Sequence, residues 1–105
     1  VCIDQGARVL FDDVGEGGPM WQGSGPREVR VFQPFRAAFI DEPAVMVSLG
    51  MWDIDHQTNG RLDIRAESIS AGGFEIVFRT WGDTHVARVR AEWLAIGTGW
   101  DEGGT

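Results

Sequence analysis

The strongest constraint on the fold of this chain is that its apolar residues recur at every second position. Residues 61–67, RLDIRAE, place Leu62, Ile64 and Ala66 on one face and charged side chains on the other. The same alternation runs through three further segments: 27–32, 73–81 and 85–97. No segment shows the spacing of an amphipathic helix, so the pattern predicts β-strands that each bury one face.

Turn residues separate these runs and indicate how the strands are connected. The turn signals are Asn59-Gly60, Gly72-Gly73 and Gly82-Asp83. Residues 44–51 are nearly all apolar, which predicts a central strand covered on both faces. About six short antiparallel strands in a chain of this size predict an all-β fold, a β-sandwich.

The 105 residues are the size of one domain. We expect a single domain over 1–105, with a core at about 10–97 and a glycine-rich C-terminal tail at 98–105. Residues 15–26 hold five glycines and two prolines and predict a loop with neither helix nor regular strand. The similar stretch 97–105 is expected to fray.

Charge and composition exclude several classes of partner. The net charge of -7 disfavours nucleic acid and anionic membranes, and no apolar run is long enough for membrane insertion. Cys2 is the only cysteine, which rules out an internal disulfide and a zinc site built on thiolates. All nine basic residues are arginine, which indicates either coding bias or several fixed, forked hydrogen bonds. No signal peptide is visible, and we expect an extracellular, surface or particle location.

The last predicted strand carries a charged stripe opposite its apolar face. Ala87, Val89, Ala91 and Trp93 alternate with Arg88, Arg90 and Glu92. The stripe is either a solvated face or a charge ladder against another protomer, and both interpretations stay open.

The sequence offers little for catalysis. His56 and His85 lie far apart, and neither a nucleophile motif nor a phosphate-binding loop is present. Asp53 and Asp55 form a weak carboxylate pair, better explained by solvated or turn-capping side chains. We therefore expect no enzyme, no metal and no cofactor, with a hydrolase using Asp53 and Asp55 as a minor alternative.

Sugar binding fits the residue types at two predicted turns, Asn59-Gly60 and Gly82-Asp83. Sugars present a C–H face and a rim of hydroxyls, which an aromatic ring and charged groups recognise. Trp81 is a candidate ring, Arg61 a candidate forked donor and Asp83 a candidate acceptor. The alternative is that Trp81 packs on a strand end, Arg61 is solvated and Asp83 caps its own turn.

Several landmarks together resemble the H-type lectin domain of snail agglutinins, discoidins and many bacterial proteins. They are the segments REVRVFQPFRAAFIDEPAVMVSLGMWDID, NGRLDIRAESISAGGFEIVFRTWGDTHV and VRAEWLAIG, within residues 10–97. The resemblance implies a six-stranded antiparallel β-sandwich that forms a trimer, or a hexamer of two trimers. It also implies galactose or N-acetylgalactosamine binding in clefts between protomers.

The resemblance assigns roles to individual residues. Arg61 stands where the family's arginine hydrogen-bonds the sugar, and Trp81 where its tryptophan lines the cleft. Gly82 replaces a histidine of the snail lectins, and Ser24 stands where they have a first-loop aspartate. Asp83 or a residue of the WQGSG loop, such as Trp21 or Ser24, is a candidate substitute.

The sequence thus predicts a carbohydrate-binding module for multivalent attachment to glycans on cell surfaces. The alternative is a trimeric assembly module of a fibre, spike or phage-like particle, with a weak or vestigial sugar site.

Overall fold

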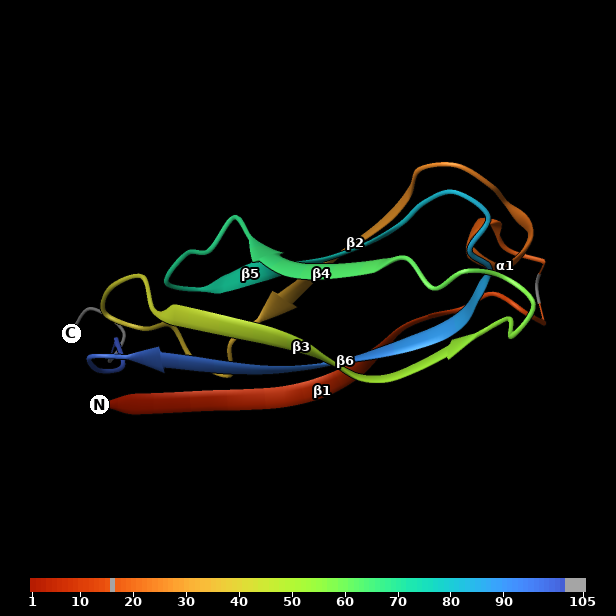
Figure 1. The fold of residues 1–105 in the computed structure, drawn as a ribbon. Coiled ribbons are helices and arrows are strands. Elements are labelled where there is room, and N and C mark those ends of the chain that lie inside the picture. Colours follow the sequence, from red (N-terminus) through yellow and green to blue (C-terminus); the bar gives the residue numbers. More distant parts are fainter. Residues whose placement is uncertain (16, 102–105) are drawn as a thin grey trace.

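The computed structural model describes residues 1–15 and 17–101, which form an elongated two-layered molecule (Figure 1). Six strands and one helical turn follow in the order β1 (Cys2–Asp12), α1 (Pro19–Gln22), β2 (Arg27–Pro34), β3 (Ala44–Ile54), β4 (Leu62–Glu67), β5 (Gly73–Thr80) and β6 (Val86–Gly97). The molecule measures 54 × 21 × 19 Å along its principal axes. Over the described residues, the structure holds no helix with the length and apolar character needed to cross a membrane.

The strands form two antiparallel sheets of three strands each. One sheet has the order β1-β6-β3 and the other β2-β5-β4. This arrangement confirms the six-stranded antiparallel β-sandwich. The alternation also holds: Phe74, Ile76 and Phe78 of β5 are fully buried, and Leu62, Ile64 and Ala66 of β4 pack against the core.

Strand β1 was not among the segments that the alternation predicted. It pairs with β6 from Cys2 opposite Gly97 to Asp12 opposite Arg88. Its buried face is unusual, because it includes the polar Asp4, which is 7% exposed, and Gly6. The indole of Trp93 lies against Gly6, where a Cβ atom would come within 3.0 Å of the ring. A glycine is needed there because the neighbouring tryptophan fills the space of a side chain.

The prediction that residues 44–51 form a central strand is wrong. Strand β3 lies at the edge of its sheet and pairs with β6 alone. Its side chains alternate between half-buried and exposed, and Met46 is 66% exposed. The apolar outer face of β3 is therefore surface in the single chain, not a second buried layer.

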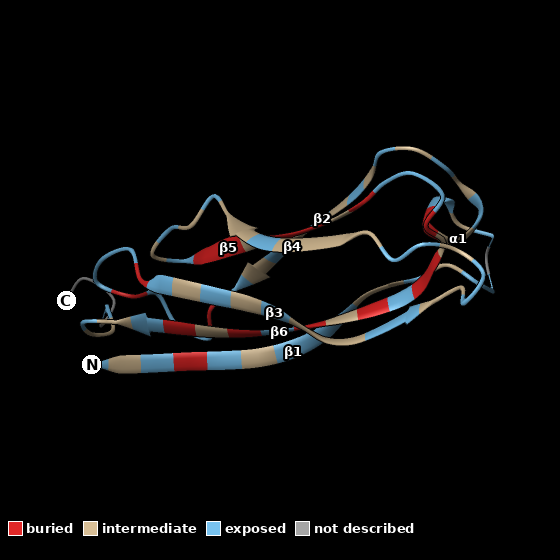
Figure 2. Ribbon diagram, in the orientation of Figure 1, coloured by how far each residue is buried: buried red, intermediate tan, exposed pale blue. Residues whose placement is uncertain are grey.

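The core lies between the sheets (Figure 2) in two clusters. The larger cluster contains Phe35, Phe39, Phe74, Ile76, Ala91, Trp93 and Ala95. The smaller cluster contains Met20, Phe78, Val86 and Val89, toward the end opposite the chain termini. The expectation that Trp93 is a core residue is confirmed, since it is 7% exposed.

The glycine-rich loop contains a helical turn that the sequence did not predict. Residues Pro19–Gln22 form one helical turn, contrary to the expectation of a loop without helix. Proline suits the first position of a helix, and the Asp13 carboxylate accepts the Met20 N–H at 3.0 Å. Met20 is 1% exposed, so its burial under the sandwich fixes the turn.

The expected fraying of the C-terminal stretch is wrong for residues 97–101. Trp100 stacks on the buried Phe39, with ring centroids 4.4 Å apart. Backbone hydrogen bonds join Ile40 N–H to the Gly99 carbonyl at 2.9 Å and Asp101 N–H to the Ala38 carbonyl at 2.8 Å. Aromatic burial thus holds a stretch whose composition favours disorder, and residues 102–105 lie outside the described part.

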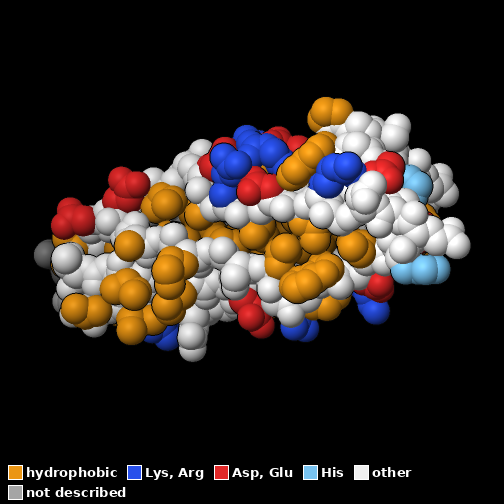
Figure 3. All heavy atoms as spheres, viewed as in Figure 1, with side chains coloured by type: hydrophobic (Ala, Val, Ile, Leu, Met, Phe, Trp, Pro, Cys, Tyr) orange, Lys and Arg blue, Asp and Glu red, His pale blue; other side chains and the backbone are white. Residues whose placement is uncertain are grey.

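The outer face of the β2-β5-β4 sheet carries an ion-pair network, visible in Figure 3 as interleaved red and blue side chains. The network consists of Glu28, Arg30, Asp63, Arg65, Glu67, Glu75 and Arg79. Its side chains cover Val77, which is fully buried although it faces outward from the core. Arginine forks that bridge two carboxylates are the fixed contacts that lysine makes less well.

Candidate functional site

The predicted site residues lie at the end of the sandwich opposite the chain termini (Figure 1). Trp81, Gly82 and Asp83 follow the end of β5, and Arg61 immediately precedes β4. Thr80 pairs with Leu62 of β4, so Arg61 and Trp81 each lie one residue beyond the paired ends of neighbouring strands. The register therefore brings residues that are 20 positions apart in sequence to one edge of the sheet.

Arg61 and Asp83 form a direct ion pair. Arg61 Nη1 lies 2.5 Å from Asp83 Oδ1. The Asn59 side-chain amide also donates to the Asp83 carboxylate at 3.2 and 3.3 Å. Donation from Asn59, supplemented by Arg61, holds the pKa of Asp83 below its usual range. Asp83 thus links the loop that contains Asn59 to the turn after Trp81.

Two buried threonines fix the backbone of Arg61. The Thr80 hydroxyl donates to the Arg61 carbonyl at 2.6 Å, and the Arg61 N–H donates to the Thr84 hydroxyl at 3.1 Å. Both threonines are at most 1% exposed. Asn59, Thr80 and Thr84 were not predicted as site residues. The signal for Thr80 was a polar residue at a position that the strand alternation assigns to the interior, whereas Asn59 and Thr84 lie outside the predicted strands.

Gly82 adopts a backbone conformation that favours glycine. Its φ of +69° is in the left-handed region, and a Cβ atom there would lie 3.3 Å from Nη1 of Arg61. Its carbonyl accepts the Gly25 N–H at 2.9 Å. A larger residue at position 82 would both strain the turn and displace the arginine beside it.

Arg27 connects the first loop to the turn after Trp81. Its guanidinium donates to four backbone carbonyls: Gly25 at 2.9 Å, Met20 at 3.2 Å, Gly82 at 3.3 Å and Pro19 at 3.4 Å. Burial lowers the pKa of Arg27, because the charged form loses hydration. Arg27 was not predicted as a site residue. Its partners are backbone carbonyls, which every residue has, so the sequence does not indicate these contacts.

Ser24 is exposed and reaches the site only through its neighbour Gly25. Among the described residues it has no side-chain hydrogen bond, so its hydroxyl faces solvent next to the Gly82 turn. Trp21 lies in the same loop with its ring centroid 6.3 Å from that of His85. The structure therefore joins the first loop and the Trp81 turn within a single chain.

Trp81 is 43% exposed and offers an indole surface to solvent beside the Arg61–Asp83 pair. A cleft of about 350 Å³ adjoins it on the β2 side. An exposed aromatic ring next to a fixed donor and a fixed acceptor is suited to binding a molecule with an apolar face and a hydroxylated rim.

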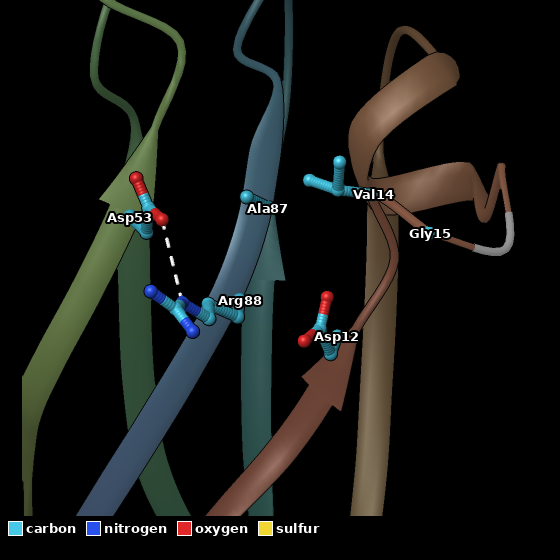
Figure 4. A pocket seen from close by; sticks show the side chains of 6 residues that line it. All are labelled: Asp12, Val14, Gly15, Asp53, Ala87 and Arg88. Atoms are coloured by element: carbon cyan, nitrogen blue, oxygen red, sulfur yellow. Dashed lines mark ion pairs between the residues drawn. The ribbon is translucent and has the colours of Figure 1, made fainter.

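Asp53 and Asp55, the two aspartates of the hydrolase hypothesis, have different partners and do not act as a pair. Asp53 pairs with Arg88 at 3.3 Å beside a hollow of about 340 Å³ that Asp12 also lines (Figure 4). Asp55 instead accepts the Gln57 N–H at 2.9 Å in its own turn. Within residues 1–15 and 17–101, no three histidine, cysteine or carboxylate side chains are grouped to hold a metal.

The charged stripe of β6 is partnered by β3 in the single chain. Besides the Arg88–Asp53 pair, Arg90 Nη2 donates to the Gly50 carbonyl at 3.1 Å. Further along the same outer face, Ile3, Met46 and Ile96 are 50%, 66% and 40% exposed. Ile3 is paired with Ile96 across the β1–β6 register, so these side chains form a contiguous apolar patch. Figure 3 shows hydrophobic side chains gathered at this end, where both termini lie.

Comparison with known proteins gives consistent relatives. The sequence profile of the H-type lectin domain matches residues 30–96. A protein of Fuscovulum blasticum named ATP synthase subunits region ORF 7 is 58% identical over 98 residues, covering 93% of this chain and 85% of that protein. A Discoidin-1 polypeptide of Dictyostelium discoideum is 35% identical over 74 residues, covering 70% of this chain and 29% of that protein.

Solved structures show the same fold. The native structure of recombinant discoidin II of Dictyostelium discoideum superimposes with a TM-score of 0.80 at 20% sequence identity. That match covers 96% of this chain and 38% of the discoidin II chain. The chain therefore spans only a part of the discoidins that it matches.

Proposed function

This chain belongs to the H-type lectin domain family, and on that premise we propose that it is a carbohydrate-binding module without catalytic activity. The observation that carries the proposal is the Arg61–Asp83 pair, held beside the exposed ring of Trp81. The expected ligands are galactose- or N-acetylgalactosamine-type sugars and related glycans, presented on a surface.

Each of these side chains has one task in the proposed mode of binding. The indole of Trp81 contacts the C–H face of the sugar ring. Arg61 donates to neighbouring hydroxyls through the N–H groups that Asp83 leaves free, since a guanidinium has five. The Asp83 carboxylate accepts from a hydroxyl in turn. Because Thr80 and Thr84 fix the Arg61 backbone, little ordering is required when the sugar binds.

Gly82 and Ser24 shape which sugar is accepted. Gly82 leaves open the space beside the Arg61 guanidinium that a side chain would occupy. Ser24 offers a neutral hydroxyl from the first loop, which both donates and accepts, whereas a carboxylate only accepts. We therefore expect the sugar preference to differ from that of a site built with histidine and aspartate at these positions.

We further propose that the protein forms a trimer, or two trimers, with sugar clefts between protomers. The apolar patch of Ile3, Met46 and Ile96 on the outer face of the β1-β6-β3 sheet supports this assembly. Exposed apolar area of this kind is stabilised by contact with a second surface. Several weak sites on one rigid body give high avidity for a glycan-coated surface.

A glycan array run with the intact protein and with Arg61→Ala tests the function. Arg65→Ala is the matched control, because Arg65 is an exposed arginine on β4, the strand that follows Arg61, and it pairs with Asp63. We expect binding by the wild type and by Arg65→Ala and loss of binding by Arg61→Ala. The oligomeric state of all three proteins is confirmed by analytical ultracentrifugation. Retained binding by Arg61→Ala contradicts the proposed site.

The apolar patch also favours a second candidate function, an assembly module of a fibre, spike or particle. In that case the contacts between protomers carry the function and the sugar site is vestigial. This candidate would be supported if the wild type forms a stable trimer but binds no galactose-type or other bacterial or animal glycan on the array. A monomer at micromolar concentration would refute the trimer in both candidates.

A further inference from the structure

The cleft beside Trp81 adjoins the proposed sugar site, with which it shares Trp81. Thr80 is paired with Leu62 of β4 on one side and with Arg27 of β2 on the other. One residue beyond these pairs, Trp81 is therefore flanked by Arg61 on the β4 side and by Pro26 on the β2 side. Strand alternation directs these three residues to the outer face of the sheet.

The cleft has the build of a small binding pocket. It measures about 350 Å³, within the usual range of ligand pockets, and is lined by Pro26, Arg27, Glu28, Arg79, Thr80 and Trp81. Pro26 and Trp81, both exposed, provide apolar walls. Glu28 and Arg79 lie at its polar side, where Arg79 Nε donates to Glu28 at 2.8 Å.

The polar groups of the cleft retain capacity for a ligand. The two Glu28 oxygens accept from Arg79 and from Arg30, each at 2.9 Å or less, and a carboxylate oxygen can accept more than one hydrogen bond. Arg79 Nη1 lies 3.8 Å from Asp63, beyond hydrogen-bond range, and donates no hydrogen bond within residues 1–15 and 17–101. One acceptor and one donor therefore remain for hydroxyls of a bound molecule.

We propose that this cleft is a second sugar subsite, which holds the residue linked to the sugar at Arg61. The inference rests on the proposed function and deepens it: the ligand is an oligosaccharide, not a single sugar. Trp81 is shared, since it borders the Arg61–Asp83 pair and also forms a wall of the cleft. Two apolar walls with a donor and an acceptor beside them match a pyranose ring, which has C–H faces and hydroxyl edges.

Titration calorimetry with matched sugars tests the subsite. The probes are galactose, N-acetylgalactosamine and neutral di- and trisaccharides that end in these sugars. The variants are Glu28→Ala, which removes the acceptor of the cleft, and Glu75→Ala as control. Glu75 belongs to the same network through Arg30 but does not line the cleft. Circular dichroism and ultracentrifugation confirm the fold and oligomeric state of each variant.

The readout is the dissociation constant of the terminal monosaccharide divided by that of the oligosaccharide. A general loss of stability does not change this ratio. For the wild type and Glu75→Ala, we expect an oligosaccharide to bind roughly tenfold more tightly than its terminal monosaccharide. For Glu28→Ala we expect this ratio to fall to near one. A wild-type ratio near one, or an undiminished ratio in Glu28→Ala, overturns the subsite while the proposed function stands. Absence of any sugar binding by the wild type overturns both.

Discussion

Replacing Arg27 by methionine is expected to loosen the first loop from the Trp81 turn. The guanidinium of Arg27 bonds four backbone carbonyls, two of them at 3.2 Å or less. Methionine keeps an unbranched apolar stem but donates nothing, so the four carbonyls lose a charged donor. The hydrogen bond from Gly25 N–H to the Gly82 carbonyl then remains as the backbone contact between the two loops.

The size of the effect follows from the two shorter bonds. A hydrogen bond from a charged donor contributes about 1.5–3 kcal/mol when it is shielded from water, and less when it is exposed. Arg27 is only partly buried, so we expect the free energy of unfolding to fall by about 2 kcal/mol in total. With a urea m-value of about 1–3 kcal/mol per molar, the unfolding midpoint shifts down by roughly 1 M.

Urea unfolding at one fixed protein concentration measures this loss, since the proposed trimer would make stability depend on concentration. Arg65→Met is the control, because Arg65 is an exposed arginine on β4 of the same sheet that pairs with carboxylates at the surface. Amide hydrogen exchange provides a local readout at Gly25, whose protection should fall in Arg27→Met. Equal midpoints for the two variants, with unchanged exchange at Gly25, would refute the reasoning.

Three further predictions concern the turn after Trp81 and the C-terminal stretch. Gly82→Ala is expected to lower the unfolding free energy by about 1 kcal/mol, because φ is +69°, and to weaken glycan binding by displacing Arg61; urea unfolding and calorimetry check both. Asp83 has a lowered pKa, so the stability from its ionised form is present above the usual aspartate pKa of about 3.9 and is lost as pH falls through the lower folded value. A pH titration of unfolding should show a shallower acid limb in Asp83→Asn than in the wild type, since Glu28 and Glu67, whose pKa values are also lowered, contribute to the limb in both proteins. Trp100→Ala should lower the unfolding free energy by about 2 kcal/mol, because Trp100 stacks on the buried Phe39; unchanged thermal unfolding would contradict this contact.

Much of the fold could be predicted from the sequence because strand alternation is a local property. Each side chain of a strand faces opposite to the next, so the buried faces of β4, β5 and β6 follow directly from residue order. The same logic identified Trp93 as core. It failed for β1, whose buried face includes Asp4 and Gly6, because polar and side-chain-free positions carry no apolar signal.

The order of strands within each sheet could not be predicted in this way. An almost continuous apolar run such as residues 44–51 is compatible with two positions of the strand. Its outer face can be covered by a second layer, or it can lie at the surface. Only the pairing of β3 with β6 alone shows that it is an edge strand. Likewise, the glycine-rich C-terminal stretch is ordered because Trp100 reaches Phe39, a contact between segments that are 61 positions apart.

The candidate site, like the fold, could be predicted from the sequence only in part. The sequence by itself determined its chemistry: an aromatic ring and an aspartate at the Gly82 turn, and an arginine after the Asn59-Gly60 turn. The tertiary structure decided how these groups are held, through Asn59 on Asp83, the threonines on the Arg61 backbone and Arg27 on the loop carbonyls. The physical reason is that residue type fixes which bonds a group can make. The partner it finds depends on strand register, which joins segments distant in sequence.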